Sequence, residues 1–507
     1  MKAQSSAMAR LWAHPAVWQP LFWGALLHLV LSWAVHLSPD EAHYALYATH
    51  LDWSYYDHPP LVGWLQWPMQ TWLSSDVGMR IWPMSVWLVT GWGLVKLSNA
   101  LYPEMASLRM WGVRLDLLLY ALSPLPHLLG FALVPDTLLM GWTVWTMLLT
   151  WRLCQSPLSS PIRSWLLLGL MLGLAGLSKY TAILIALGVL LSLLHAHGLK
   201  LLLGKGAWVA LFTALLCITP VVYWNATHDW MSFTYQIQHA QGGKNWVWFK
   251  AVGFALTIWL AMGLLLPMSL WGGLTDSGSG ADQRHLSPAR CSVYFGLPGV
   301  LLFVYLSGRG STLPHWVVPF AVALIPCAAW GMRRQWLRWS RWQHGVLWLQ
   351  ALLMAAFFVM VLAGGRQEEG AQKTTLAGQE GVPAVKNPLA DLYGWDLAAQ
   401  RAQQLAVEQG ANTLAVMNWT LASRVAWYAR PLPVKVIHSH QDQFDLWFGT
   451  VQAQDKVLLL DWSIMSFKPP VAEHQFKQCE FLEQLPVVHA GRQLAHFNFM
   501  LCTGWSP

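Results

Sequence analysis

Residues 16–44 read AVWQPLFWGALLHLVLSWAVHLSPDEAHY, an apolar run that ends just before the acidic pair Asp40 and Glu41. A helix needs about 20 predominantly apolar residues to cross a bilayer, and residues 16–36 supply them. The acidic pair is therefore expected at a membrane surface. Carboxylates are expensive to desolvate there, and a membrane protein that keeps them usually uses them.

The composition of the chain is that of a polytopic membrane protein. Of its 507 residues, 55% are hydrophobic and 11% are charged, whereas soluble globular proteins carry roughly 25% charged residues. The 35 Trp residues suit a protein with much of its surface at membrane–water interfaces. Much of the Lys and Arg behind the net charge of +7 falls in short loops between apolar runs. We therefore expect no nucleic-acid partner.

Eleven apolar runs predict about eleven transmembrane helices. They lie at 16–36, 78–98, 110–130, 136–153, 163–178, 180–197, 206–224, 248–271, 290–308, 313–331 and 343–363. Lys and Arg fall in alternate loops, which indicates a cytoplasmic N-terminus. The first run lacks a small-residue cleavage site and is expected to stay as an anchor. The loop 37–77 and everything after residue 364 are then expected outside the cytoplasm.

The tail after the last run predicts a small α/β domain. Residues 1–363 are the expected transmembrane domain, residues 364–388 predict a linker because they are rich in Gly, Gln, Lys and Glu, and residues 389–507 form the tail domain. Alternating patterns are typical of an α/β fold. We expect helices at Leu397–Gln409 and Ala422–Tyr428, and strands at Thr413–Met417, Val434–Ile437 and Val457–Leu460.

The six Cys residues divide into two groups. Four lie in or beside apolar runs and are expected to be packing residues: Cys154, Cys217, Cys291 and Cys327. Cys479 and Cys502 lie in the polar tail, where an extracytoplasmic location would let them form a disulfide. Two free thiols are the alternative.

With this topology, polar residues next to the membrane collect on one side of it. They are Asp40, Glu41, Asp57 and His58 in the first outer loop, Asp136, Lys179, Tyr180, His228, Asp229, Arg309 and His315. A carboxylate can take a proton from an acceptor hydroxyl or amine. A departing phosphate needs cations such as Lys179 and Arg309, or a metal, to neutralise its charge. This set indicates glycosyl transfer from a lipid-phosphate sugar.

The chain contains neither a GxxxxGK[ST] motif nor a GxGxxG after a strand. The energy for transfer is therefore expected to come from an already activated lipid donor.

Structural roles remain open for several of these residues. Asp40 could cap the helix expected at Glu41–Leu51, and Asp136 could cap the fourth run, because Asp is a favoured N-cap residue. Lys179 could extend its ammonium to the interface. Asp57-His58-Pro59-Pro60 is expected to shape a rigid turn before a helix at Leu61–Leu73.

The sequence predicts no metal ligands. His43 and His50 lie seven residues apart on one helical face, which is a weak metal signal. A divalent ion is left open as a cofactor.

At these residues the chain resembles the lipid-linked sugar transferases of the type-C glycosyltransferase fold. The nearest branch is the one related to bacterial aminoarabinose–lipid A transferase and protein O-mannosyltransferases. Beside the acidic pair, the matching motifs are Tyr55-Tyr56-Asp57-His58-Pro59-Pro60, Val134-Pro135-Asp136, Gly176-Leu177-Ser178-Lys179-Tyr180-Thr181, Leu313-Pro314-His315-Trp316, Asp391-Leu392-Tyr393-Gly394-Trp395 and Gln443-Phe444-Asp445-Leu446-Trp447. The resemblance implies a polytopic α-helical protein of a bacterial inner membrane with a small C-terminal periplasmic α/β domain.

The resemblance also implies roles for single residues. Asp40, with Glu41 beside it, would be the acidic centre and the base, and Asp136 the second acidic motif. The donor phosphate would contact Lys179 and Arg309. The sugar or acceptor pocket would be lined by Tyr56, Asp57, His58, Tyr180 and His315. Asp136 stands alone where some relatives have a pair, which weakens the case for a metal between the two motifs. Inverting relatives imply one catalytic carboxylate and no covalent intermediate.

We therefore expect a glycosyltransferase that moves one sugar from a polyprenyl-phosphate donor to an acceptor on the periplasmic face. The acceptor would be lipid A or another envelope glycan or lipid. Donor, acceptor and membrane lipids are the expected partners, and a monomer is expected. Protein O-glycosylation is an alternative within the class. A sugar-lipid transporter is an alternative of another class, but a transporter should have related halves with broken helices at the midplane.

Overall fold

The structure is a computed structural model that describes residues 15–158, 160–241, 245–263, 270–271, 286–310, 312–365, 387–437, 441–465 and 475–506. Its contacts divide the chain into two compact units. The first takes in the described parts of Met1–Val30, Asp52–Leu65 and Arg80–Met354. The second takes in those of Leu31–Leu51, Gln66–Met79 and Ala355–Pro507.

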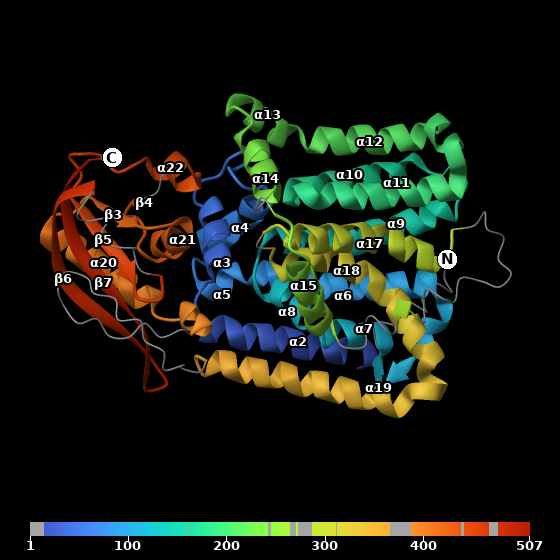
Figure 1. Cartoon of the computed structure of the whole chain (residues 1–507). Coiled ribbons are helices and arrows are strands. Elements are labelled where there is room, and N and C mark those ends of the chain that lie inside the picture. Colours follow the sequence, from blue (N-terminus) through green and yellow to red (C-terminus); the bar gives the residue numbers. More distant parts are fainter. Residues whose placement is uncertain are drawn as a thin grey trace. The chain divides into compact units, whose positions relative to one another are not determined.

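Helices make up most of the described chain up to Leu362 (Figure 1). They are α2 (Pro15–Ala34), α3 (Pro39–Tyr47), α4 (Leu61–Trp72), α5 (Asp76–Met79), α6 (Ile81–Leu101), α7 (Leu115–Ala121), α8 (Pro124–Phe131), α9 (Pro135–Cys154), α10 (Ile162–Ser178), α11 (Ile183–His197), α12 (Lys205–Cys217), α13 (Thr219–Thr227), α14 (Met231–Gln241), α15 (Trp248–Met262), α17 (Pro288–Ser307), α18 (Val318–Ala321) and α19 (Ile325–Leu362). Short 3₁₀ segments join some of them: η1 (Pro103–Ser107), η2 (Tyr180–Ala182), η3 (Gly198–Leu203), η4 (Pro314–Val317) and η5 (Val322–Leu324).

Within the described residues, five segments are long and apolar enough to cross a membrane, or up to seven if each of two bent helix pairs counts as one span. The five are Val17–Ala34, Tyr180–Leu203, Pro288–Ser307, Pro314–Arg334 and Ser340–Leu362. The shorter helices α10 and α15 are also apolar. The chain is a polytopic helical membrane protein, and the expected number of eleven spans stays a prediction.

Two of the expected runs are bent or divided. Residues 110–130 contain the end of a small hairpin, β1 (Arg109–Met110) and β2 (Val113–Arg114), followed by α7 and α8. Helix α8 then meets α9 at an angle of 115°. Both helices begin at a Pro, which fits the first turn of a helix but not its interior. In the run 206–224, α12 and α13 meet at 43°.

The first unit is held together by helices packed along their lengths. Helix α10 contacts both α9 and α12, and α11 contacts α17. Figure 1 shows α10, α11 and α12 running side by side. This packing brings the α8–α9 bend, next to Asp136, and the α10–η2 junction, at Lys179, into the same unit.

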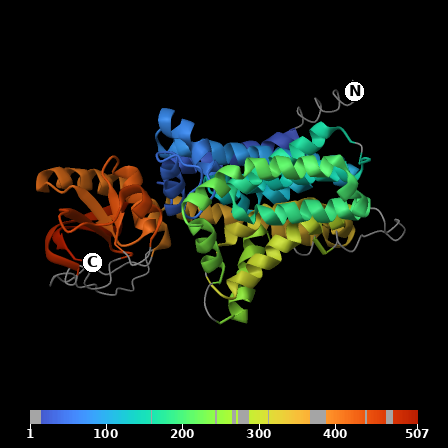
Figure 2. The same ribbon diagram turned by 90° about the horizontal axis from the view of Figure 1, so that it is seen from above.

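The second unit contains a five-stranded sheet, drawn in orange and red in Figure 2. Its elements after residue 387 are η6 (Pro388–Leu392), α20 (Trp395–Gln409), β3 (Thr413–Val416), α21 (Trp419–Tyr428), β4 (Val434–Val436), α22 (Gln443–Phe448), β5 (Val457–Trp462), β6 (Phe476–His489) and β7 (Arg492–Trp505). The strand order is β4-β3-β5-β7-β6. Strand β3 is parallel to β4 and β5, whereas β7 is antiparallel to β5 and β6.

The expected secondary structure of the tail matches the first part of this unit. Strands β3, β4 and β5 and helices α20 and α21 lie where the sequence predicts them. The long hairpin of β6 and β7 was not predicted. The linker expected at 364–388 falls almost entirely on residues 366–386, which lie outside the described residues. The expected domain boundaries stay a prediction.

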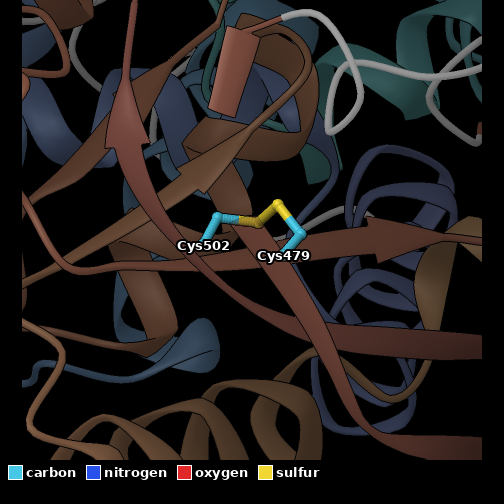
Figure 3. Close-up of a disulfide and its surroundings, with 2 residues drawn as sticks. All are labelled: Cys479 and Cys502. Carbon is cyan, nitrogen blue, oxygen red and sulfur yellow. A yellow bond between two sulfur atoms is a disulfide. The ribbon is translucent and has the colours of Figure 1, made fainter. Parts of the chain in front are cut away.

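A disulfide joins Cys479 on β6 to Cys502 on β7 (Figure 3). The two residues lie directly opposite each other in the antiparallel register. Cys502 is fully buried in a cluster with Val457, Leu459 and Phe476. The structure therefore has the disulfide and not the two free thiols.

Candidate active site

Asp136 and Lys179 form a buried ion pair in the first unit. The Lys179 ammonium nitrogen lies 2.6 Å from Asp136 Oδ2, and the two side chains are 8% and 2% exposed. Asp136 is the second residue of α9, and Lys179 follows the last residue of α10 in an extended conformation (φ −158°, ψ 143°). Removing one partner of such a pair leaves an uncompensated buried charge.

His315 and Trp316 complete this cluster from η4. His315 Nε2 lies 3.8 Å from the same Asp136 oxygen, and the Lys179 ammonium lies 5.1 Å from the centre of the Trp316 ring. Asp136 Oδ1 is buried and has no hydrogen-bond partner among the described residues. A buried acceptor of this kind calls for an explanation, and a ligand hydroxyl is one.

The structural alternatives for Asp136 and Lys179 do not fit this geometry. The cap of α9 is Val134, whose backbone N–H donates to Thr137 Oγ1 at 3.3 Å. Asp136 is therefore not the N-cap. Lys179 is bound to a buried carboxylate, so its ammonium does not extend freely to an interface.

Arg309 follows α17 and the small residue Gly308. Its guanidinium carbon lies 5.9 Å from the Tyr305 ring centre, and its Nε is buried without a hydrogen-bond partner among the described residues. Within those residues, no ion pair or hydrogen bond joins it to Lys179 or Asp136. Its shared role with Lys179 stays a prediction.

The motif around Tyr56, Asp57 and His58 is a loop that α14 holds by its backbone. Tyr55 N–H donates to the His58 carbonyl at 3.1 Å, which closes the turn. From α14, Ser232 Oγ donates to the Tyr55 carbonyl and Gln236 Nε2 to the Asp57 carbonyl, each at 2.6 Å. The expectation of a shaped turn is met.

Aromatic contacts also join α14 to Tyr56 and Tyr180. The Tyr56 ring centre lies 4.9 Å from that of Tyr235, and the Tyr180 ring centre lies 5.2 Å from that of Phe233. Tyr180 is the residue after Lys179, so α14 touches both the loop and the α10–η2 junction. That Tyr56 and Tyr180 line a sugar or acceptor pocket stays a prediction.

Asp40 and Glu41 lie in α3, which belongs to the second unit. Ser38 is the N-cap: Glu41 N–H donates to Ser38 Oγ at 3.4 Å, and Ser38 N–H donates to Glu41 Oε2 at 3.0 Å. Glu41 is 4% exposed and its carboxylate serves this capping box. Asp40, which was expected to be the cap in the structural alternative, is not the cap. That Asp40 and Asp136 share one site stays a prediction.

Arg80 is a buried cation that was not among the predicted site residues. It is 2% exposed, and its guanidinium carbon lies 3.9 Å from the centre of the Phe131 ring, at the end of α8. It therefore borders the bend that presents Asp136. An Arg at the start of an apolar run was the signal that could have found it.

Among the described residues, there is no group of three or more His, Cys, Asp or Glu side chains arranged to hold a metal ion. His43 instead packs among rings: its ring centre lies 5.2 Å from that of Tyr47 and 5.4 Å from that of Trp419. His50 stacks on Trp447 at 4.9 Å. Metal dependence stays open to experiment.

A family profile matches about a third of this chain, and a relative matches 70% of it. The profile described as dolichyl-phosphate-mannose-protein mannosyltransferase matches residues 57–224. The lipid A galacturonosyltransferase RgtD of Rhizobium johnstonii is 23% identical over 383 residues, which cover 70% of this chain and 76% of that protein.

Two solved structures share the fold over almost the whole length. The crystal structure of ArnT from Cupriavidus metallidurans in the apo state matches with a TM-score of 0.59 and 15% identity, over 94% of this chain and 97% of that chain. ArnT from the same organism bound to undecaprenyl phosphate matches with a TM-score of 0.60 and 16% identity, over the same shares.

Proposed function

We propose that this chain, which shares the fold of ArnT, is a lipid-linked glycosyltransferase of the type-C fold that moves one sugar from a polyprenyl-phosphate donor to lipid A or another envelope glycan or lipid. The observation that carries the proposal is the buried Lys179–Asp136 pair beside His315. A cation held in a buried site by a carboxylate is placed to stabilise the negative charge that develops on a departing phosphate.

The donor side of the proposal rests on Lys179, Trp316 and Arg309. Lys179 would approach the phosphate from its position between Asp136 and the Trp316 ring. Arg309, whose Nε is buried without a partner among the described residues, would supply a second set of donors. The structural match to an ArnT bound to undecaprenyl phosphate supports a polyprenyl-phosphate carrier.

The acceptor side rests on Asp40. Because the capping box occupies Glu41, Asp40 is the member of the acidic pair that we assign as base. Its carboxylate would take the proton of an acceptor hydroxyl while that oxygen bonds to the anomeric carbon. The bond to the phosphate oxygen breaks with both electrons, and polyprenyl phosphate leaves. One displacement inverts the anomeric centre.

Lipid A is the preferred acceptor because the relative RgtD is a lipid A galacturonosyltransferase. The dolichyl-phosphate-mannose-protein mannosyltransferase profile favours protein O-glycosylation as the second candidate. Mass spectrometry of lipid A and of envelope proteins from a deletion strain separates them. Loss of a sugar from lipid A supports the first, and loss from proteins supports the second. A sugar-lipid transporter would instead move the donor between leaflets of vesicles without releasing polyprenyl phosphate.

The test of the reaction is release of polyprenyl phosphate by purified protein. Release should require both a polyprenyl-phosphate sugar and an acceptor lipid. Asp40→Asn should lower kcat about 10²–10⁴-fold, the usual contribution of a general base. Glu408→Gln is the control, because Glu408 lies in the same unit, is 52% exposed and pairs with Arg401. Turnover by Asp40→Asn at the wild-type rate rules out the base assignment.

A further inference from the structure

The hydroxyl of Tyr428 ties together two distant pieces of chain in the second unit. Tyr428 is the last residue of α21. Its hydroxyl oxygen accepts the backbone N–H of Leu37 at 2.8 Å and donates to Asp76 Oδ2 at 2.7 Å. Leu37 immediately precedes the Ser38 cap of α3, and Asp76 begins α5.

Further contacts fasten the chain entering α3 to the C-terminal part of the unit. His36 N–H donates to the Leu392 carbonyl at 3.0 Å, and its ring centre lies 5.3 Å from that of Tyr428. In the next turn of α3, His43 Nδ1 lies 3.4 Å from Ser423 Oγ on α21. The start of α3 is therefore held by α21 on both sides of Asp40.

Helix α21 is anchored by contacts at its start and in its middle. Asn418 caps it by accepting the N–H of Leu421. Arg424, 1% exposed, pairs with Asp391, and its guanidinium carbon lies 3.8 Å from the centre of the Trp395 ring. A helix anchored at its start and middle can transmit a fixed position to Tyr428 at its end.

Arg424 also links α21 to Asp40 electrostatically. Burial lowers the pKa of Arg424, while the charges of Asp391, Tyr428 and Asp40 oppose that change. The Asp40 carboxylate thus lies within the field of a buried guanidinium on the same helix as Tyr428.

We infer that Tyr428 is a positioning residue for Asp40, acting through the backbone at Leu37 and through Asp76. The inference rests on the proposed role of Asp40 as base. The C-terminal α/β fold then places the carboxylate, since residues 31–51 and 66–79 form one unit with it. A displacement of about 1 Å in a catalytic group can cost roughly 10²-fold in rate.

Tyr428→Phe tests this inference because it removes only the hydroxyl. We expect kcat to fall about 10-fold or more, with the KM for the donor within about 2-fold of wild type, since ground-state binding is untouched. Tyr393→Phe is the matched control: Tyr393 belongs to the same unit, and its hydroxyl donates to the Val361 carbonyl at 2.5 Å. That variant should keep the wild-type kcat.

A double-mutant cycle distinguishes positioning from general destabilisation. Asp76→Ala should lower kcat in the wild-type background and have little further effect in Tyr428→Phe, because both act through one hydroxyl. Asp76→Asn keeps an acceptor oxygen and should recover most of the rate. Additive losses, or a wild-type kcat in Tyr428→Phe, overturn the inference. If wild-type protein transfers no sugar from any polyprenyl-phosphate donor, the proposed function itself fails instead.

Discussion

The opposite charges of Lys179 and Asp136 compensate each other in a buried site. A buried pair of this kind contributes little net stability, but losing one partner typically costs about 3–5 kcal/mol because the other charge stays buried. We therefore propose a functional role for the pair. Asp136 Oδ1, which has no hydrogen-bond partner among the described residues, points to the same conclusion.

Lys179→Met should therefore lower both the stability of the protein and its rate of sugar transfer. We expect the free energy of unfolding to fall by about 3–5 kcal/mol, because the Asp136 carboxylate loses its cation. The double variant Asp136→Asn/Lys179→Met removes both charges of the pair, so it should recover most of the stability and none of the activity. Thermal unfolding in detergent and polyprenyl phosphate release measure the two effects.

Lys96→Met is the control for this experiment, since the Lys96 ammonium also lies over a Trp ring, 5.6 Å from the centre of Trp92. It should change transfer little. A double variant that remains active would remove Lys179 from the phosphate site.

Single residues were only partly predictable. Ser38 and Glu41 have the spacing of a capping box, but the structural alternative placed the cap at Asp40. The pairing of Asp136 with Lys179, 43 residues apart, could not be predicted from spacing. It depends on how α9 and α10 pack.

At the scale of elements, local patterns predicted helices and buried strands well. The hairpin of β6 and β7 was missed for a physical reason. Strand β6 lies at the edge of the sheet and is largely exposed, so it has no apolar run. Its turn contains Ala490 and Gly491, both at positive φ, and Ala-Gly lacks the Asn-Gly or Asp-Gly signal typical of such turns.

The disulfide across this hairpin gives a prediction at the same scale. Replacing Cys479 and Cys502 by Ser should destabilise the unit by about 2–4 kcal/mol, because the closed loop no longer restricts the unfolded chain. In denaturant, wild-type protein should take up four maleimides without reductant, from the four free cysteines, and six after reduction. Six maleimides without reductant would mean that the disulfide does not form in the protein as isolated.

At the scale of the whole molecule, the side of the membrane on which the tail lies decides whether the proposed chemistry can work. Two independent features agree. Lys and Arg fall in alternate loops, which predicts a periplasmic tail. The Cys479–Cys502 disulfide favours an oxidising compartment such as the periplasm. The number of spans could not be predicted securely, since bends such as that between α8 and α9 leave one span or two.

Reporter fusions on either side of the last apolar segment test this topology. The segment Ser340–Leu362 is long enough to cross the bilayer once. A fusion after Arg341 should therefore read as cytoplasmic and one after Arg366 as periplasmic. The same result would place Cys479 and Cys502 where disulfides form, and α3, which shares their unit, on the side where a lipid A acceptor is met. If both fusions read as cytoplasmic, the last segment does not cross, and the assignment of Asp40 as a periplasmic base falls with it.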